Sequence, residues 1–320
     1  NTTNDLICRY GITGGYNYQY RNIGSVENKG LEFSVKGVAL DHHSKNLDYN
    51  LTLDANISFN KNKIKDLGGL GYIEEATAVF STSNITYSEF YLTVGDPMGQ
   101  ILGYETDGWY KASDFDAYDV STGWLKDGKL ISTPFDSKGA YPGLMKFKDK
   151  NGDGEITEAD KTIIGNTLPL ATGGFSISGN VGSKNIGMFD LSANFTYSIG
   201  NDVLNLNKVD YTTITSTDEK TSYRNSLTDV ASGKRYSQFD ANGQWIPGQY
   251  GISGKTGSLS GAAYQTMAQA MDAMNANASI WSPIMPAYAV TDYAVEDGSY
   301  LKLDNLTVGY TFKFKENKYI

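Results

Sequence analysis

The sequence has few of the residues on which catalysis and covalent cross-linking usually depend. Cysteine occurs once, at Cys8, which excludes an internal disulfide framework. Histidine occurs twice, and His42 and His43 are neighbours in one hydrophilic stretch. The sequence shows no Ser-His-Asp arrangement, no catalytic cysteine context and no phosphate-binding loop. We therefore predict that the protein is not an enzyme, and that both histidines are solvated turn residues rather than metal ligands.

Positive charge and long apolar runs are also scarce. Lys and Arg number 27 against 36 Asp and Glu, which gives a net charge of -9 and argues against a nucleic-acid partner. No apolar run approaches the roughly 18–20 residues that a membrane helix needs. The mean hydropathy of -0.38 is typical of a soluble protein. It is equally compatible with a transmembrane β-barrel, whose lumen and outer loops are polar.

Residues that favour β-strands are abundant. The 320 residues include 35 Gly, 23 Tyr and 13 Phe but only 7 Pro. This composition predicts an all-β chain of one large domain or two ordinary ones.

The strongest periodic signal runs over residues 47–60. Apolar side chains occupy one face, at Leu47, Tyr49, Leu51, Leu53, Ala55, Ile57 and Phe59, and polar side chains the other. Strict alternation over this length predicts a strand with one apolar and one wet face. At ~3.3 Å per residue such a strand spans about 46 Å, or roughly 33 Å at ~45° tilt.

Four further segments alternate in the same way, at residues 31–36, 175–181, 189–198 and 300–312. In the last of them the phase slips at Asp304 and Asn305, which predicts a bulge. Tyr16, Tyr18 and Tyr20 suggest one more strand near the start.

The lengths of the connections between the predicted strands help to distinguish one kind of β-protein from another. Residues 41–46 and 183–185 are short turns, whereas 113 residues separate Phe59 from Gly173 and 100 separate Ile199 from Tyr300. Short turns at one end and long connections at the other are typical of outer-membrane barrels. A soluble β-protein with two large insertions is the alternative. Five or six strands cannot close a membrane barrel, so we expect the remaining strands to lie outside this chain.

Residues 149–160 (DKNGDGEITEAD) match the twelve-residue EF-hand calcium loop. The expected oxygen ligands are Asp149, Asn151, Asp153, Glu155 and Asp160. Asp160 replaces the usual Glu and has a shorter reach. A turn held by bonds from Asp and Asn side chains to the backbone is the alternative. In either case the motif would stabilise a long loop.

The four tryptophans all lie in or beside the long connections. Aromatic faces can stack on sugar rings, so Trp109, Trp124, Trp245 and Trp281 are candidate substrate-binding residues. Alternatively, they pack small cores within the loops. Residues 261–276 show the one helical pattern, with Tyr264, Met267, Met271 and Met274 on one face. This row of side chains would contact a partner protein or, alternatively, pack the helix against its own loop.

Four motifs together resemble the SusC/RagA family of TonB-dependent outer-membrane transporters of Bacteroidota. They are residues 22–32 (NIGSVENKGLE), 94–100 with 103–108 (VGDPMGQ and GYETDG), 149–166 ending in DKTIIGN, and 296–303 with 307–310 (EDGSYLKL and TVGY). The resemblance covers most of the chain.

The resemblance implies a large antiparallel barrel of about 22 strands with a plugged lumen. It further implies import of glycans or peptides, with glycans favoured, driven by TonB and aided by a SusD-like surface lipoprotein. On this interpretation residues 1–320 are part of one barrel domain in the lipid of the outer membrane. Residues 60–172 and 200–299 are then long extracellular loops.

The chain starts at Asn1 without Met or a signal peptide and ends at Ile320, just past a strand-like segment. We expect an internal fragment that lacks the plug domain and the segment that contacts TonB. A calcium-stabilised, surface-exposed binding or adhesion β-protein is the alternative function.

Overall fold

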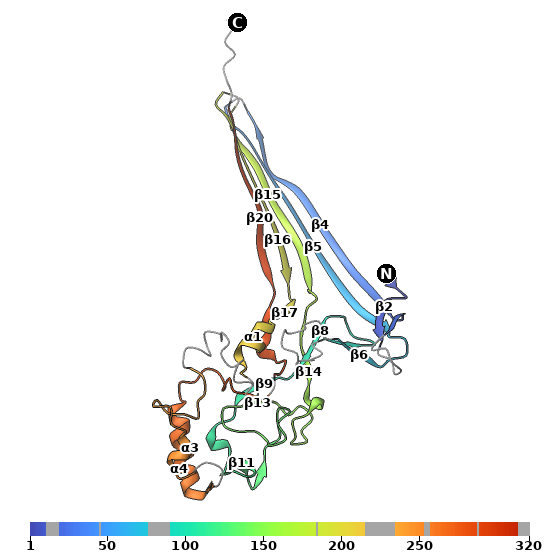
Figure 1. Cartoon of the computed structure of the whole chain (residues 1–320). Helices are drawn as coiled ribbons and strands as arrows, with labels where there is room; N and C mark the ends of the chain where they lie inside the picture. The colour runs from blue at the N-terminus through green and yellow to red at the C-terminus, as the bar shows by residue number, and fades with distance from the viewer. Residues whose placement is uncertain are drawn as a thin grey trace.

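The computed structural model describes residues 1–10, 19–44, 46–75, 90–183, 185–214, 234–252, 257–286 and 288–312. A sheet of long strands forms one end of the molecule, and shorter strands, loops and helices form the other (Figure 1). We call the described parts of residues 67–170 and 200–299 the loop module. Within the described residues, no helix is long and apolar enough to cross a membrane.

The long sheet is antiparallel and has the strand order β1-β4-β5-β15-β16-β20. Its strands are β1 (Thr2–Thr3), β4 (Ser25–His43), β5 (Asp48–Asp66), β15 (Ala171–Ser183), β16 (Gly187–Ile199) and β20 (Tyr300–Phe312). Order in the sheet therefore follows order in the chain. A separate pair joins β2 (Ile7–Tyr10) to β3 (Gln19–Asn22). Of the three tyrosines predicted to mark a strand near the start, Tyr20 lies in β3, and Tyr16 and Tyr18 are outside the described residues.

The strand register places apolar residues of neighbouring strands opposite one another. Leu53 is opposite Ile177, Ile177 is opposite Ala193, and Ala193 is opposite Leu306. Because paired residues point to the same face, the predicted apolar positions of the strands from β5 to β20 gather on one side. The predicted bulge is confirmed: Asn194 pairs with Asn305 and Phe195 with Leu303, which leaves Asp304 without a partner in the register.

Two strand boundaries differ from those predicted. β4 continues to His43, and His42 and His43 lie opposite Tyr49 and Asp48, so the histidines are strand residues and not turn residues. The turn itself is closed by Ser44, whose hydroxyl donates to the Leu47 carbonyl at 2.7 Å. β5 runs on to Asp66, so the first long connection begins after residue 66 rather than at residue 60.

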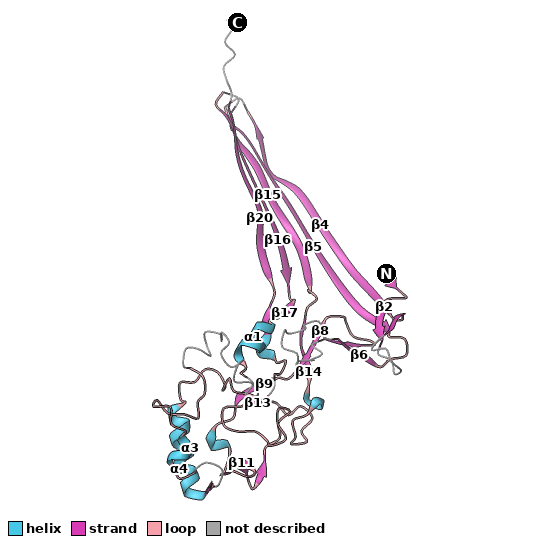
Figure 2. Ribbon diagram, viewed as in Figure 1, coloured by secondary structure: helices cyan, strands magenta, loops and turns pink. Residues whose placement is uncertain are grey.

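Small sheets organise the loop module (Figure 2). One has the order β14 (Thr162–Asn166), β8 (Gln100–Gly103), β7 (Phe90–Thr93) and β6 (Tyr72–Glu75). Another has the order β12 (Lys129–Leu130), β11 (Gly123–Lys126), β10 (Ala117–Asp119) and β18 (Ser258–Ser260). Two pairs are β13 (Met145–Phe147) with β9 (Thr106–Trp109) and β17 (Asp202–Leu204) with β19 (Val295–Asp297). The α-helices among the described residues are α1 (Leu206–Thr212), α3 (Ile246–Gln249) and α4 (Gly261–Met274), and the 3-10 helices are Ala112–Asp114, Glu158–Asp160 and Asp292–Ala294.

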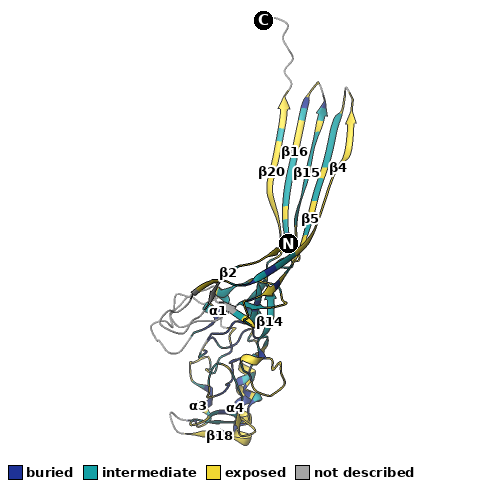
Figure 3. Cartoon of the chain, turned by 90° about the vertical axis from the view of Figure 1, so that its right-hand side faces the viewer, coloured by how far each residue is buried: buried dark blue, intermediate teal, exposed yellow. Residues whose placement is uncertain are grey.

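The largest hydrophobic core lies in the loop module and not in the long sheet (Figure 3). It takes side chains from both long connections, and the β10–β18 pairing joins the two directly. On α4, Tyr264, Met267 and Met271 are buried in this core, and the Tyr264 hydroxyl donates to the Ala112 carbonyl at 2.7 Å. The methionine stripe therefore docks the helix on its own loops, as the second of the two interpretations predicted.

Candidate functional site

One face of the long sheet is a broad apolar surface exposed to its surroundings. Leu31 is 65% exposed, Phe33 59% and Val308 59%. Burying such surface is strongly favourable, and a patch this extended marks an interaction surface. In the strand register, residues of four strands lie side by side and form successive rows across this face. They are Tyr49-Val181-Phe189-Tyr310, Leu51-Gly179-Leu191-Val308, Leu53-Ile177-Ala193-Leu306 and Ala55-Phe175-Phe195-Leu303.

The two ends of this face differ in chemistry. Towards the short turns it ends in the aromatic row that contains Tyr49, Phe189 and Tyr310, and the His42 ring stacks on Tyr49 with centroids 5.2 Å apart. Towards the loop module it ends in the cross-strand pair of Lys29 and Lys61. Twelve residues along β5 separate Tyr49 from Lys61, which is about 40 Å of strand and roughly 28 Å at ~45° tilt. This agrees with an apolar band of about 25 Å bordered by aromatic residues.

The opposite face of the sheet is polar. The Lys36 ammonium lies 4.0 Å from the Asp54 carboxylate, and the Thr196 hydroxyl donates to Asp304 at 2.6 Å. Asn, Ser and Thr fill much of the rest of this face, as predicted for a surface in contact with water.

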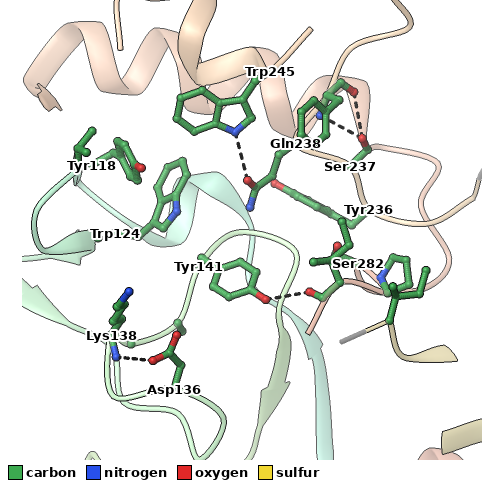
Figure 4. A pocket seen from close by; sticks show the side chains of 18 of the residues that line it. Tyr118, Trp124, Asp136, Lys138, Tyr141, Tyr236, Ser237, Gln238, Trp245 and Ser282 are labelled. Atoms are coloured by element: carbon green, nitrogen blue, oxygen red, sulfur yellow. Dashed lines mark hydrogen bonds between the residues drawn. The ribbon is translucent and has the colours of Figure 1, made fainter. Parts of the chain in front are cut away.

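A cavity of about 510 Å³ lies in the loop module between the two long connections (Figure 4). Its aromatic wall includes Tyr118, Trp124 and Trp245. The Tyr118 ring centroid lies 4.6 Å from that of Trp124 and 5.7 Å from that of Trp245. This volume is within the range of small-molecule sites. The cavity could therefore hold a sugar ring or a short side chain against aromatic surface.

Polar groups of the cavity are held in place by neighbours. The Gln238 amide donates to the Pro142 carbonyl at 2.8 Å and accepts from the Trp245 indole N–H at 3.4 Å. The Tyr141 hydroxyl donates to the Ile284 carbonyl at 2.8 Å. Burial, and then the nearby Asp136 charge, raise the pKa of Tyr141, so this hydroxyl keeps its proton as a donor.

Of the four candidate tryptophans, the structure brings Trp124 and Trp245 together at this cavity. Trp281 is buried against Tyr293 at a centroid distance of 4.7 Å, and Trp109 packs on the same core from β9. Neither of these two is among the residues that line the cavity. Sequence reasoning missed Tyr118, Tyr141 and Gln238 because nothing local distinguishes them from other loop residues.

The predicted calcium loop is ordered by bonds from its own side chains. The Asp149 carboxylate accepts from the N–H of Gly152 at 2.6 Å and of Gly154 at 2.8 Å, and Asp153 accepts from Glu155 N–H at 2.8 Å. Gly152 and Gly154 have φ of +77° and +84°, a conformation that favours glycine. This loop therefore has the backbone-bonded turn that was the alternative interpretation.

Asp160, the last residue of the motif, is fully buried and bonded on both oxygens. It accepts from Lys150 N–H at 2.9 Å and from Thr157 N–H at 2.7 Å. Burial by itself raises the pKa of Asp160, but the backbone bonds outweigh it and lower the pKa. The residues of the described ranges contain no group of three or more His, Cys, Asp or Glu side chains placed to hold a metal ion.

Comparison with known proteins connects these features to one family. The chain is 28% identical over 298 residues to TonB-dependent receptor P3 of Formosa agariphila, a match over 92% of the chain and 23% of that receptor. It is 25% identical over 317 residues to TonB-dependent receptor SusC of Bacteroides thetaiotaomicron, over 97% of the chain and 23% of SusC. These matches confirm the predicted resemblance to the SusC/RagA family of TonB-dependent receptors.

Solved structures show that the chain also shares a fold with proteins of this kind. The RagAB peptide transporter matches 96% of it with a TM-score of 0.55 and 18% identity, over 25% of that chain. The chain thus spans about a quarter of the length of the relatives it matches. No family model matches it. Because the curated relatives are receptors and not enzymes, the prediction of a protein without enzymatic activity is confirmed.

Proposed function

We propose that this chain supplies wall strands and outer loops to a barrel that imports nutrients across the outer membrane of a Bacteroidota bacterium. The observation that carries the proposal is the exposed apolar face, which is continuous across five strands and bordered by aromatic rings at one end and by lysines at the other. The family relationship supports it, because TonB-dependent receptors are outer-membrane proteins.

The orientation of the strands gives the first test. Figure 1 shows the short turns at one end of the long sheet and the loop module at the other. On our proposal the turns face the periplasm and the loop module faces outwards. With Cys8 replaced by Ser in the full-length protein, a cysteine at Ser137 should react with an impermeant reagent on whole cells, and one at Ser44 should not. The second cysteine should react after the cells are opened. Equal labelling of the two on intact cells would contradict the topology.

The proposed substrate is a glycan, with a peptide as the alternative. The aromatic wall formed by Tyr118, Trp124 and Trp245 supports a glycan, because flat rings stack on sugars. RagAB, the structural relative, is named as a peptide importer. Growth of a deletion strain on single glycans and on single peptides separates the two. Loss of growth on one glycan supports the proposal, and loss confined to peptides replaces it with the alternative.

Two partners follow from the same proposal. A SusD-like surface lipoprotein would cover the outward side of the loop module, and the names of the SusC and RagAB relatives support such a partner. TonB would supply energy through a part of the receptor outside these 320 residues. Co-purification of a lipoprotein with the full-length protein, and its loss when the loop module is deleted, would test the first of these contacts.

We also propose that the loop of residues 149–160 binds one calcium ion that keeps the outer loop ordered. Asp149, Asn151, Asp153 and Glu155 are exposed. A carboxylate has about four acceptor positions, so bonds to backbone N–H groups leave further lone pairs for a cation. Asp160 would support the loop from inside. A metal that binds only the ordered loop stabilises it by mass action.

Replacing Asp153 by Ala should weaken calcium binding and make this loop more sensitive to protease, while the long sheet stays assembled. A chelator should have the same effect on the unmutated protein. Asp119→Ala is the matched control, since Asp119 shapes a different turn of the loop module through Ser121. If calorimetry detects no binding at millimolar calcium, the loop is held by its own hydrogen bonds alone.

A further inference from the structure

A second hollow, of about 830 Å³, lies where the apolar face of the long sheet meets the loop module. We call it the lysine groove. Its lining comes from β4, β5, the turn at residues 95–97 and residues 166–170 before β15. These residues include Leu31, Phe59, Lys61, Lys63 and Leu170. The groove therefore spans the boundary between the apolar rows and the charged end of the sheet.

The strand register shows which face of the sheet this groove occupies. Leu31 pairs with Phe59 and Lys29 with Lys61, and all four line the groove. Lys63 is on the same face and lines the groove too, whereas three other lining residues, Gly30, Asn60 and Asn62, occupy positions of the polar face. Five of the eight lining residues from β4 and β5 thus belong to the apolar face, and Leu31 and Phe59 continue the exposed apolar rows directly into the groove.

The groove has more lysines than neighbouring carboxylates: Lys29, Lys61 and Lys63 line it, and Glu27 lies opposite Lys63 in the strand register. Lys29 is paired with Glu27 at 2.9 Å. Lys61 and Lys63 are exposed and form no ion pair within the described residues. Two ammonium groups thus lie next to an apolar hollow, so a ligand that fits both parts needs an anionic group joined to a hydrocarbon chain.

We propose that the lysine groove binds one membrane lipid with a phosphate-bearing headgroup. An acyl chain lies against Leu31, Phe59 and Leu170, and the phosphate lies at Lys61 and Lys63. The inference rests on the proposed function, because the apolar face has to be in a bilayer for a lipid to reach it. Since the groove is at the loop-module end of the strands, the lipid belongs to the outer leaflet. A free phosphate ion would leave the apolar part of the groove empty.

The test uses the full-length protein in a neutral detergent, with bound lipid counted by native mass spectrometry. The probes are a monophosphorylated acylated disaccharide lipid, the same lipid after removal of its phosphate, and sodium phosphate. The unmutated protein should retain one phosphorylated lipid at a concentration where few copies of the other two bind. Charge attraction at a membrane surface is strong enough that Lys61→Gln with Lys63→Gln should weaken binding roughly 10- to 30-fold.

Two matched variants complete the experiment. Lys36→Gln removes a lysine from the polar face of β4 and should leave lipid binding unchanged. Leu170→Ser changes the apolar wall, carries no charge, and should also weaken binding. Equal retention of both lipids, or retention unaffected by the double lysine change, would overturn the proposal. So would binding of sodium phosphate as tight as that of the lipid. Resistance of the same protein to carbonate extraction from membranes tests the proposed function separately.

Discussion

Arginine in place of Leu53 is expected to destabilise the membrane-inserted protein by about 2–4 kcal/mol, the cost of a cation on the lipid face near the bilayer midplane. Leu53 lies in the third apolar row, between the aromatic row at Tyr49 and the lysine pair at Lys61, and it is 43% exposed. No polar group of its own row is available to solvate the guanidinium, because its neighbours are Gly37 and Ile177.

The adjacent residue is the control. Asp54 points to the polar face, where its carboxylate is 4.0 Å from Lys36, so Asp54→Arg should cost much less even though it brings two cations together. Both free energies come from refolding the full-length protein into lipid vesicles over a urea titration. A larger cost at position 54 than at position 53 would mean that the wet and lipid faces are assigned the wrong way round.

The second large effect is expected within the loop module. Met267 is fully buried in the core beneath α4, so Met267→Ala leaves a cavity and should cost about 2–5 kcal/mol of the stability of the module. The long sheet should be unaffected because none of its five long strands contributes to this core. Hydrogen exchange of the full-length protein would show faster exchange in α4 and β18 with unchanged protection in β5 and β15.

The same helix provides a matched control. Met274 is 40% exposed at the end of α4, and Met274→Ala removes the same side chain where little packing is lost. It should change exchange rates slightly at most. If the two alanine variants behaved alike, the methionine stripe would not be anchoring the helix, and contact with a partner would become the better account of it.

The sequence predicted the strands only over the stretches where apolar and polar residues alternate, because there one face of the strand is apolar. Alternation located β5, β15, β16 and β20, and the phase slip at Asp304 located a bulge that the register confirms. The prediction ended β5 at residue 60 because the next residues are Lys61, Asn62 and Lys63, which are polar on both faces. These residues still pair with β4, so hydrogen bonding extends the strand past the point where the apolar pattern stops.

The cavity was not predictable in the same way. Its walls join Tyr118 and Trp124 of the first long connection to Gln238 and Trp245 of the second, more than one hundred residues later. Aromatic content suggested Trp124 and Trp245, but the same reasoning also selected Trp281, which the fold buries elsewhere. A periodic pattern describes one element, whereas a cavity depends on how separate elements pack.

The shared core of the two long connections has a consequence for how the sheet is built. β4–β5 and β15–β16 are local hairpins, but the β5–β15 and β16–β20 pairings each close a loop of about a hundred residues, and closing such loops slows folding. Because side chains of both connections meet in one core, and β10 pairs with β18, an early-formed loop module would hold the ends of these distant strands close together. The loop module would then fix the order of the strands before their backbone hydrogen bonds form.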